Sequence, residues 1–287
     1  MIGIIGGTGL GDALAKCLMD VQTQTVDTPF GKPSDAICVG KLGSNKVAFL
    51  NRHGPGHRLN PSCVPYAANV FALKKLGVTT LIASGAVGSL QQEYKPRELV
   101  IVDQFIDKTF RRQNTFFDKL GAVHCELAQP CCGRLRKRLL QAAKKIKAKV
   151  HPNGTYVCME GPQFSSRAES LMHRAWGGSL IGMTAMPEAK LAREAQMCYA
   201  LVALVSDYDC WQEHHSQTDK QLLLKEIIGN LDAATENAIA LIKALLEQDD
   251  NLCDETCPCR KSLELAVWTN PQTIDIQVKQ ELSVLFK

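Results

Sequence analysis

The sequence predicts an α/β fold: a single domain with a central mixed, partly parallel β-sheet and helices on both of its faces. Short apolar runs of strand length alternate along the chain with longer amphipathic segments, as expected when helices cover a sheet. Several of the apolar runs end in glycine-rich or polar clusters, and ligands collect at the carboxyl ends of strands in such sheets. No internal repeat or low-complexity linker interrupts the pattern, so one domain is the simplest division.

In the first half of the chain, apolar runs predict four strands and apolar periodicity predicts one helix. The strands are expected at residues 2–5, 47–50, 78–83 and 98–102, and the helix at residues 64–76. The first strand stops at a glycine cluster, the second at a segment with arginine and histidines, and the third at small residues 84–88, which are expected to form a turn. Three strand ends are therefore expected to converge on one cleft.

The second half of the chain is mostly helical in its pattern. Apolar spacing predicts an amphipathic helix from Leu135 to Ile146. Ser166 and Glu169 form a capping box that should open a helix, and Pro187 is well placed to begin another. A buried strand at residues 199–205 and a long helix at residues 219–247 complete the prediction.

Composition and charge exclude several classes of protein. The chain has 287 residues, of which 45% are hydrophobic and 22% charged, as in ordinary globular proteins. Its 33 Lys and Arg against 29 Asp and Glu give 33 − 29 = +4, too mild to indicate a nucleic-acid partner, and the basic stretch 134–149 is interpreted as a solvated helix face. No apolar run reaches the ~18 residues that span a bilayer, and residues 1–5 are too short for a signal peptide. We expect a cytoplasmic protein without a membrane partner; a small anionic substrate remains compatible.

Twelve cysteines are present, most of them in apolar runs where cysteine acts as a small hydrophobic residue. Cys253, Cys257 and Cys259 differ because they lie in a polar segment with C-x3-C-x-C spacing. Neither a fourth cysteine nor a histidine lies alongside, and structural zinc normally needs four ligands. We therefore expect no metal site here, but unpaired thiols, with a redox-sensitive pair or a disulfide as the alternative.

Two carboxylates, Asp207 and Asp209, directly follow the apolar run 199–205 and precede Trp211. Set between a buried strand and aromatic side chains, they should occupy a semi-enclosed site in which water screens charge poorly. Such a site is suited to protonating a substrate. The alternative is a polar loop in which Asp207 caps a helix and Asp209 faces solvent.

The glycine turn at residues 6–9 is a candidate anion site. It exposes backbone N–H groups, with the Thr8 hydroxyl among them. It is not a dinucleotide fingerprint, because Asp12 stands where the third glycine should be, and this argues against a nicotinamide-dependent oxidoreductase. A tight structural turn is the alternative.

Arg52 and His53 are a more specific anion signal, because a guanidinium fork and an imidazole at one strand end can bind phosphate oxygens together. The alternative is an arginine paired with a surface carboxylate. The small-residue segment 84–88 and the Thr184 hydroxyl add two further elements able to approach an anion.

Phe164 and Met183 are candidates for contact with the organic part of a ligand. Phe164 follows a Glu-Gly-Pro-Gln segment and could offer an aromatic face to a flat ring, or it could be an ordinary core side chain. Met183 could pack against a sugar or fill core space.

Taken together, these motifs resemble the trimeric purine nucleoside phosphorylases, most closely their methylthioadenosine phosphorylase branch. The resemblance spans roughly residues 1–245, and several motifs together are more specific than any one alone. The motifs are Gly6-Gly-Thr-Gly-Leu10, Asp27-Thr-Pro-Phe-Gly-Lys-Pro-Ser34, Arg52-His-Gly54 with His57, Glu160-Gly-Pro-Gln-Phe-Ser-Ser-Arg-Ala-Glu169, Gly182-Met-Thr184 with Pro187-Glu188, and Ser206-Asp-Tyr-Asp-Cys-Trp211.

The resemblance implies a phosphorylase domain at residues 1–250 and a C-terminal extension at residues 251–287, which would pack on the same domain or on a neighbouring subunit. It also implies a homotrimer that cleaves 5′-methylthioadenosine with phosphate, giving adenine and 5-methylthioribose 1-phosphate in purine and methionine salvage. Inorganic phosphate is the co-substrate and no cofactor is expected. The alternatives are a broader purine nucleoside phosphorylase acting on adenosine or inosine, and a catalytically silent nucleoside-binding protein.

The resemblance also implies a role for each candidate site residue. Phosphate would be bound by Thr8, Arg52, His53, the 85–86 segment (Gly85 and Ala86) and Thr184, with Ser84 or backbone N–H groups replacing the threonine that some relatives carry at position 85. The nucleoside would contact Met183, Phe164, Ser165, His57 and, from a neighbouring subunit, His124. Asp207 would protonate purine N7 and Asp209 would accept from the exocyclic amino group, a pair that prefers adenine to a 6-oxopurine.

Overall fold

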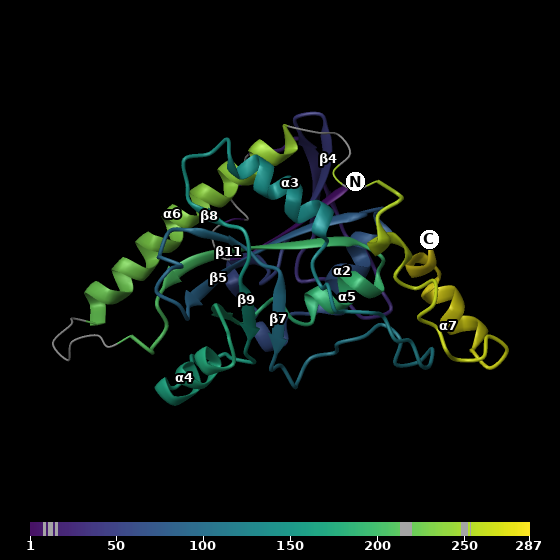
Figure 1. Ribbon diagram of the computed structural model, residues 1–287. Coiled ribbons are helices and arrows are strands. Elements are labelled where there is room, and N and C mark those ends of the chain that lie inside the picture. The colour runs from purple at the N-terminus through teal and green to yellow at the C-terminus, as the bar shows by residue number, and fades with distance from the viewer. Residues whose placement is uncertain (8–9, 11–13, 15–16, 213–219, 248–251, 253) are drawn as a thin grey trace.

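The computed structural model of the protein describes residues 1–7, 10, 14, 17–212, 220–247, 252 and 254–287. Its centre is a mixed sheet in the order β2-β3-β4-β1-β5-β10-β9-β7, from which β11 branches to pair with β5 and β6, and β6 with β8 (Figure 1). The strands are β1 Ile2–Gly6, β2 Met19–Gln24, β3 Ile37–Leu42, β4 Asn45–Asn51, β5 Thr80–Ser89, β6 Leu99–Ile101, β7 Gln104–Asp107, β8 Val150–His151, β9 Thr155–Cys158, β10 Leu180–Gly182 and β11 Cys198–Asp207.

Helices cover both faces of this sheet. The helices are α2 Tyr66–Lys75, α3 Gly133–Ala143, α4 Arg167–Ala175, α5 Glu188–Glu194, α6 Lys220–Leu246 and α7 Ile276–Glu281. Helices α3 and α6 pack on one face, and α2 and α5 on the other (Figure 1). The predicted α/β class, with a mixed sheet flanked by helices, is confirmed.

The alternation of side chains along the strands divides the core into two layers. Ile4 of β1 and Phe49 of β4 point to the α3 and α6 side, whereas Ile5 and Leu50 point to the α2 and α5 side. All four are buried, so these strands are apolar on both faces. Strands β1, β4, β5 and β11 run parallel, which brings their carboxyl ends to one edge.

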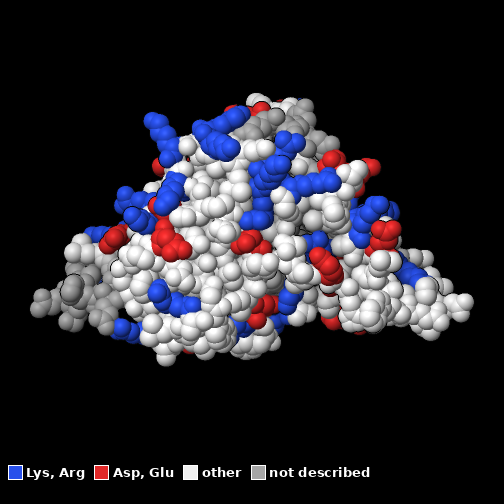
Figure 2. Space-filling model, viewed as in Figure 1, with Lys and Arg blue, Asp and Glu red and all other residues white. Residues whose placement is uncertain are grey.

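Local sequence signals account for several boundaries. The capping box that opens α4 is present in full: the Ser166 side chain accepts from the Glu169 N–H, and the Glu169 side chain accepts from the Ser166 N–H. On α3, Leu135 and Leu139 face the core, while its basic side chains gather on the solvent side (Figure 2). The part of the basic stretch that lies on α3 is therefore a solvated helix face, as expected, whereas residues 144–149 lie beyond the end of the helix.

The prediction of a turn at residues 84–88 is wrong. These residues continue strand β5, because each pairs with the parallel strand β11, from Ser84 opposite Val202 to Gly88 opposite Asp207. Small side chains are typical of turns, but in this strand they leave room on the side of the sheet where a pocket lies.

The C-terminal segment contributes to both core layers. Leu263 and Leu285 join the layer on the α2 and α5 side, and Cys257 and Cys259 join the layer of α3 and α6. Although these two cysteines lie in a polar segment of the sequence, they are only 1% and 6% exposed. Cys253 lies outside the described residues. In the part of the chain that the structure describes, no helix is long and apolar enough to cross a membrane.

Candidate active site

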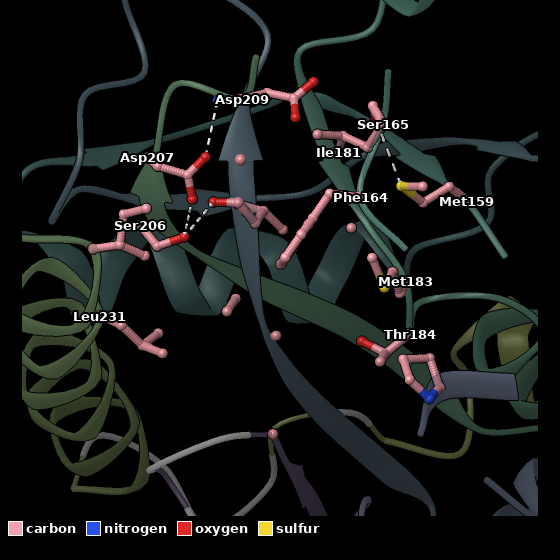
Figure 3. Close-up of a pocket in the computed structure, with 18 of the residues that line it drawn as sticks. Met159, Phe164, Ser165, Ile181, Met183, Thr184, Ser206, Asp207, Asp209 and Leu231 are labelled. Atoms are coloured by element: carbon pink, nitrogen blue, oxygen red, sulfur yellow. Dashed lines mark hydrogen bonds between the residues drawn. The ribbon is translucent and has the colours of Figure 1, made fainter. Parts of the chain in front are cut away.

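A pocket of about 310 Å³ lies at the carboxyl ends of the parallel strands (Figure 3). It is lined by residues that follow or end β1, β4, β5, β9, β10 and β11, together with two side chains of α6. Of the predicted site residues, the pocket brings together Arg52, His53, His57, Gly85, Ala86, Phe164, Ser165, Met183, Thr184, Asp207 and Asp209. Ser84 and His124 do not line it, and Thr8 lies outside the described residues.

A β-bulge aims Asp207 into the pocket. The pairing of β11 with β5 shifts between Val205 and Asp207, so that Ser206 is the extra residue and Asp207 faces Gly88. A Cβ atom on Gly88 would lie 3.1 Å from Asp207 Oδ1, closer than most real contacts. The bulge and the glycine together therefore create the space that the carboxylate occupies.

The hydrogen bonds of Asp207 suit a group that gains and loses a proton. Its Oδ1 accepts from the Asp209 N–H at 2.9 Å, and its Oδ2 lies 2.6 Å from Ser206 Oγ (Figure 3). The single Ser206 hydroxyl proton has a second acceptor, the Val87 carbonyl, at 3.2 Å. Ser206 can donate to an ionised Asp207, or donate to Val87 and accept from a protonated Asp207, so both forms are hydrogen-bonded.

Asp209 is held by a different element. Its Oδ2 accepts a hydrogen bond from the Ser170 hydroxyl of α4. Its backbone has a φ of 28°, a left-handed conformation that aspartate tolerates better than most residues. The alternative in which Asp207 caps a helix is wrong, because Asp207 ends β11 and its carboxylate lines the pocket.

Arg52 is fully buried and forms a bidentate pair with Glu188. Its Nε and Nη2 donate to the two Glu188 oxygens at 2.8 and 2.9 Å, and its Nη1 donates to the Ser84 carbonyl at 2.7 Å. The Tyr199 hydroxyl also donates to Glu188, at 3.1 Å. The guanidinium is thus locked at the pocket floor with its charge balanced, and the predicted alternative of a surface carboxylate is wrong.

His53 is neutral and has one ring nitrogen available. Burial, with Arg52 beside it, lowers the pKa of His53 to about 4. Its Nδ1 lies 2.8 Å from the Leu59 carbonyl, which can only accept, so Nδ1 carries the proton. Nε2 of the neutral ring is therefore an acceptor, suited to a protonated phosphate oxygen.

Small residues on β5 bring the remaining polar groups close together. A Cβ on Gly85 would lie 3.1 Å from Thr184 Oγ1, so glycine at this position leaves room for the threonine hydroxyl. The Gly7 N–H points at the Ser84 hydroxyl at 3.5 Å. Ser84 is 2% exposed and lies behind the pocket wall. Its hydroxyl faces the Gly7 N–H, and its carbonyl accepts a hydrogen bond from Arg52.

The aromatic and histidine candidates fall into two groups. Phe164 reaches the pocket (Figure 3) but is 86% exposed, so the alternative of a core phenylalanine is wrong. His57 stacks on His53 with ring centroids 4.1 Å apart. His124 instead lines a separate hollow on the surface. Its ring forms a T-shaped contact with Trp268, with the ring centroids 5.1 Å apart.

The fold and this pocket can be compared with known proteins. The model of the phosphorylase superfamily matches residues 1–247. The chain belongs to the phosphorylase superfamily. It is 45% identical over 285 residues to the S-methyl-5′-thioadenosine phosphorylase of Cereibacter sphaeroides, covering 99% of this chain and 97% of that protein. The enzyme of the same name from Gloeobacter violaceus is 44% identical over 99% of this chain and 94% of its own length.

Solved structures agree with the sequence relatives. A methylthioadenosine phosphorylase from an antarctic soil metagenomic library has a TM-score of 0.91 and 41% identity, covering 100% of this chain and 98% of that one. A mutant of the adenosine/methylthioadenosine phosphorylase of Schistosoma mansoni, solved with methylthioadenosine, has a TM-score of 0.80 and 36% identity, with coverages of 92% and 95%. The resemblance expected from the motifs is confirmed.

In this phosphorylase, a buried ion pair behind the pocket holds Met183 in place. Arg112 donates from Nη1 to the carbonyls of Met183 and Met186, both at 2.6 Å, and from Nε to Glu160 at 3.1 Å. Glu160 also accepts from the Ser62 hydroxyl at 2.5 Å. The sequence did not indicate Arg112, because it lies in an irregular polar segment without a motif.

The phosphorylase is expected to lose the stabilising effect of Glu160 in acid. Burial alone would raise the pKa of Glu160, but hydrogen bonds from Ser62 and Phe110 and the Arg112 guanidinium outweigh burial and lower the pKa to about 2. A lowered pKa stabilises the folded state above the ordinary value of 4.5, and this effect disappears as the pH falls toward 2. Glu160→Gln should therefore lower the free energy of unfolding by about 3 kcal/mol at pH 7 and by much less at pH 3.

Urea unfolding at several pH values measures this difference. The exposed Glu93→Gln is the matched control and should behave like the unchanged protein throughout. A Glu160→Gln defect of equal size at pH 7 and pH 3 would show that the carboxylate charge is not its cause.

The sequence also did not indicate several apolar side chains of this site. Ile227 and Leu231, one turn apart on α6, line the pocket, and Figure 3 places Leu231 on the same side as Ser206 and Asp207. Ile181 of β10 and Met159 after β9 add to the apolar lining. The i, i+4 spacing on α6 was visible in the sequence, but the same spacing is typical of any core-facing helix.

Proposed function

We propose that this protein cleaves 5′-methylthioadenosine with inorganic phosphate, giving adenine and 5-methylthioribose 1-phosphate. The observation that carries the proposal is that a carboxylate pair and a set of anion-binding groups line one pocket of nucleoside size. Figure 3 has Asp207 on one side of the pocket and Thr184 on the other. Relatives that share 44–45% of their residues with nearly the whole chain carry this activity in their names.

Phosphate would bind at the end of the pocket formed by Arg52, His53, Thr184 and the 85–86 segment. The Arg52 charge is already balanced by Glu188, and His53 is neutral, so phosphate would be held by hydrogen bonds more than by net charge. The Thr184 hydroxyl and the His53 Nε2 acceptor suit a hydrogen phosphate with one P–OH group. Held there, a phosphate oxygen can attack the anomeric carbon as the glycosidic bond lengthens.

The purine would bind at the other end of the pocket. As the bond breaks, the base becomes anionic, and a protonated Asp207 neutralises it at N7. Asp209, fixed by Ser170, would accept from the exocyclic amino group of adenine. A carbonyl oxygen in that place would face a carboxylate, so a 6-oxopurine would leave two acceptors opposed. Met183 would lie against the ribose, with Phe164 and Ser165 beside the base.

The apolar lining supports a substrate with an apolar group in place of the 5′-hydroxyl. Ile227 and Leu231 offer aliphatic surface, which gains from burying a methylthio group and gains nothing from a hydroxyl. Adenosine would therefore be a weaker substrate. The chemistry requires phosphate as co-substrate and no organic cofactor.

We further propose a homotrimer in which His124 completes the site of a neighbouring subunit. His124 does not line the pocket of its own chain, and it lies in a surface hollow beside the exposed Trp268. Leu265 is 89% exposed and Phe110 80%, and large apolar side chains so exposed are typical of surfaces that contact another chain.

Phosphate dependence of adenine release tests the proposal. The purified full-length protein is given methylthioadenosine with and without phosphate, and adenine and the sugar phosphate are measured by chromatography. We expect adenine and 5-methylthioribose 1-phosphate in equal amounts, and only with phosphate. Adenine release without phosphate would indicate a hydrolase, and binding without release would indicate a nucleoside-binding protein; either result contradicts the proposal.

A further inference from the structure

Four buried thiols meet outside the pocket lining and take no part in the proposed reaction. The Sγ atoms of Cys132, Cys198, Cys257 and Cys259 all lie within 4.8 Å of one another. The sulfur atoms of Cys132 and Cys257 lie 3.6 Å apart. All four residues are buried in the core layer of α3 and α6.

The four residues come from three distant parts of the chain. Cys132 is the N-cap of α3, Cys198 is the first residue of β11, and Cys257 and Cys259 flank Pro258 in the C-terminal segment. The C-terminal segment alone has too few ligands for zinc, which is why the sequence predicts no metal site there. The fold supplies the missing ligands, Cys132 and Cys198, from elsewhere.

We propose that these four cysteines bind one zinc ion in a tetrahedral site of four thiolates. With Zn–S bonds of about 2.3 Å, tetrahedral geometry places the sulfur atoms about 3.8 Å apart. The longest separation in the cluster would have to shorten by about 1 Å, a change within the reach of side-chain rotation. Four mutually close sulfurs are what a tetrahedral metal requires, whereas two disulfides would need only two close pairs.

Charge at the cluster fits a bound zinc. Four thiols that bind Zn²⁺ release their protons, which leaves four negative charges on sulfur against two positive charges on the metal. The Arg193 guanidinium donates from Nη1 to Cys259 Sγ at 3.6 Å and would offset part of the excess. Cys132 lies at the N-terminus of α3, where the helix dipole favours a thiolate. The excess negative charge is thus offset in part by groups already in place.

The zinc site would fasten the C-terminal segment to the core. Arg134 of α3 already contacts this segment through Asp254 and Thr256, at 2.8 and 2.9 Å. Farther along, the Ala266 carbonyl accepts from the His124 N–H at 2.9 Å. The metal would therefore stabilise the segment that supports the His124 loop, without contacting the reacting groups.

Metal analysis of the unmodified protein tests the proposal. The full chain is produced in zinc-supplemented medium and purified without a polyhistidine tag or chelator, and its zinc and iron are measured by mass spectrometry. We expect about one zinc per chain and little iron. All twelve cysteines should react with a thiol reagent after unfolding in chelator without reductant. Iron in place of zinc, no metal, or four unreactive cysteines that need reductant would overturn the proposal.

Variants locate the metal. Cys259→Ser should reduce the zinc content at least tenfold, whereas Cys63→Ser, which changes an exposed cysteine outside the cluster, should leave it unchanged. Full zinc retention in Cys259→Ser would contradict the site.

Two measurements on the unmodified chain remain informative if Cys259→Ser fails to fold. Protein grown with cobalt should show the intense sulfur-to-metal charge-transfer bands of tetrahedral cobalt thiolate. A strong chelator should lower its melting temperature by several degrees, and added Zn²⁺ should restore it. Cobalt spectra without thiolate bands, or a melting temperature that does not change with chelator or added zinc, would overturn the proposal.

Discussion

Asp207→Asn is expected to lower kcat for methylthioadenosine by roughly 10²–10⁴-fold, with a much smaller change in KM. The amide keeps the size of the carboxyl group and can still receive the Asp209 N–H hydrogen bond, but it cannot transfer a proton to N7. The loss should therefore be confined to the step in which the base leaves. Steady-state rates of adenine release at saturating phosphate measure it.

The matched control for this variant is Asp232→Asn, which alters a carboxylate of α6 one residue beyond the pocket-lining Leu231. It should retain the rate of the unchanged protein. A variant that loses affinity and keeps its kcat would show that Asp207 holds the base without protonating it.

Arg52→Met is expected to have the second large effect, on both stability and phosphate binding. Removing the guanidinium leaves the buried Glu188 carboxylate without its bidentate partner, which costs about 3–5 kcal/mol of folding free energy. It also removes a donor from the phosphate end of the pocket. The free energy of unfolding and the KM for phosphate measure the two effects separately.

The double variant Arg52→Met with Glu188→Leu separates these effects further. With both charges gone, no unpaired carboxylate remains at this place in the core, so most of the lost stability should return. The weakened phosphate binding should not return, because the donor is still missing. If the double variant is no more stable than the single one, the stability defect has a cause other than the unpaired Glu188.

Local signals in the sequence were enough to predict strands β1, β4, β5, β6 and β11 and the flanking helices, but not the remaining strands of the sheet. Apolar runs at residues 2–5 and 199–205 are strands, and the Ser166 and Glu169 capping box opens a helix. These features depend on neighbours within a few residues, which is the range over which sequence patterns act. The convergence of strand ends on one cleft followed from the parallel arrangement of those strands.

Features that depend on distant contacts could not be predicted. The 84–88 segment looks like a turn and becomes a strand only because β11 pairs with it. The buried partner of Arg52 lies 136 residues farther along the chain. Cys132 and Cys198 gave no sign of joining Cys257 and Cys259, since both lie far from that segment in the sequence and Cys198 adjoins an apolar run in which cysteine usually serves as a small hydrophobic residue.

The direction in which the Asp207 carboxylate points depends on structural details that no sequence motif encodes. The bulge at Ser206 and the absent side chain of Gly88 together place Asp207, and neither can be recognised before the register of two strands is known. The sequence therefore identifies the two carboxylates as candidates. That the Ser206 hydroxyl can donate either to Asp207 or to the Val87 carbonyl can be recognised only from the fold.

Adenine recognition by the two aspartates is tested most directly by comparing three nucleosides side by side at saturating phosphate. Values of kcat/KM are measured for methylthioadenosine, adenosine and inosine with the same preparation of enzyme. We expect the highest value for methylthioadenosine, a lower one for adenosine because its 5′-hydroxyl meets an apolar lining, and the lowest for inosine because its 6-oxo group faces Asp209. A value for inosine equal to or above that for methylthioadenosine would contradict the assignment of Asp207 and Asp209 as readers of adenine.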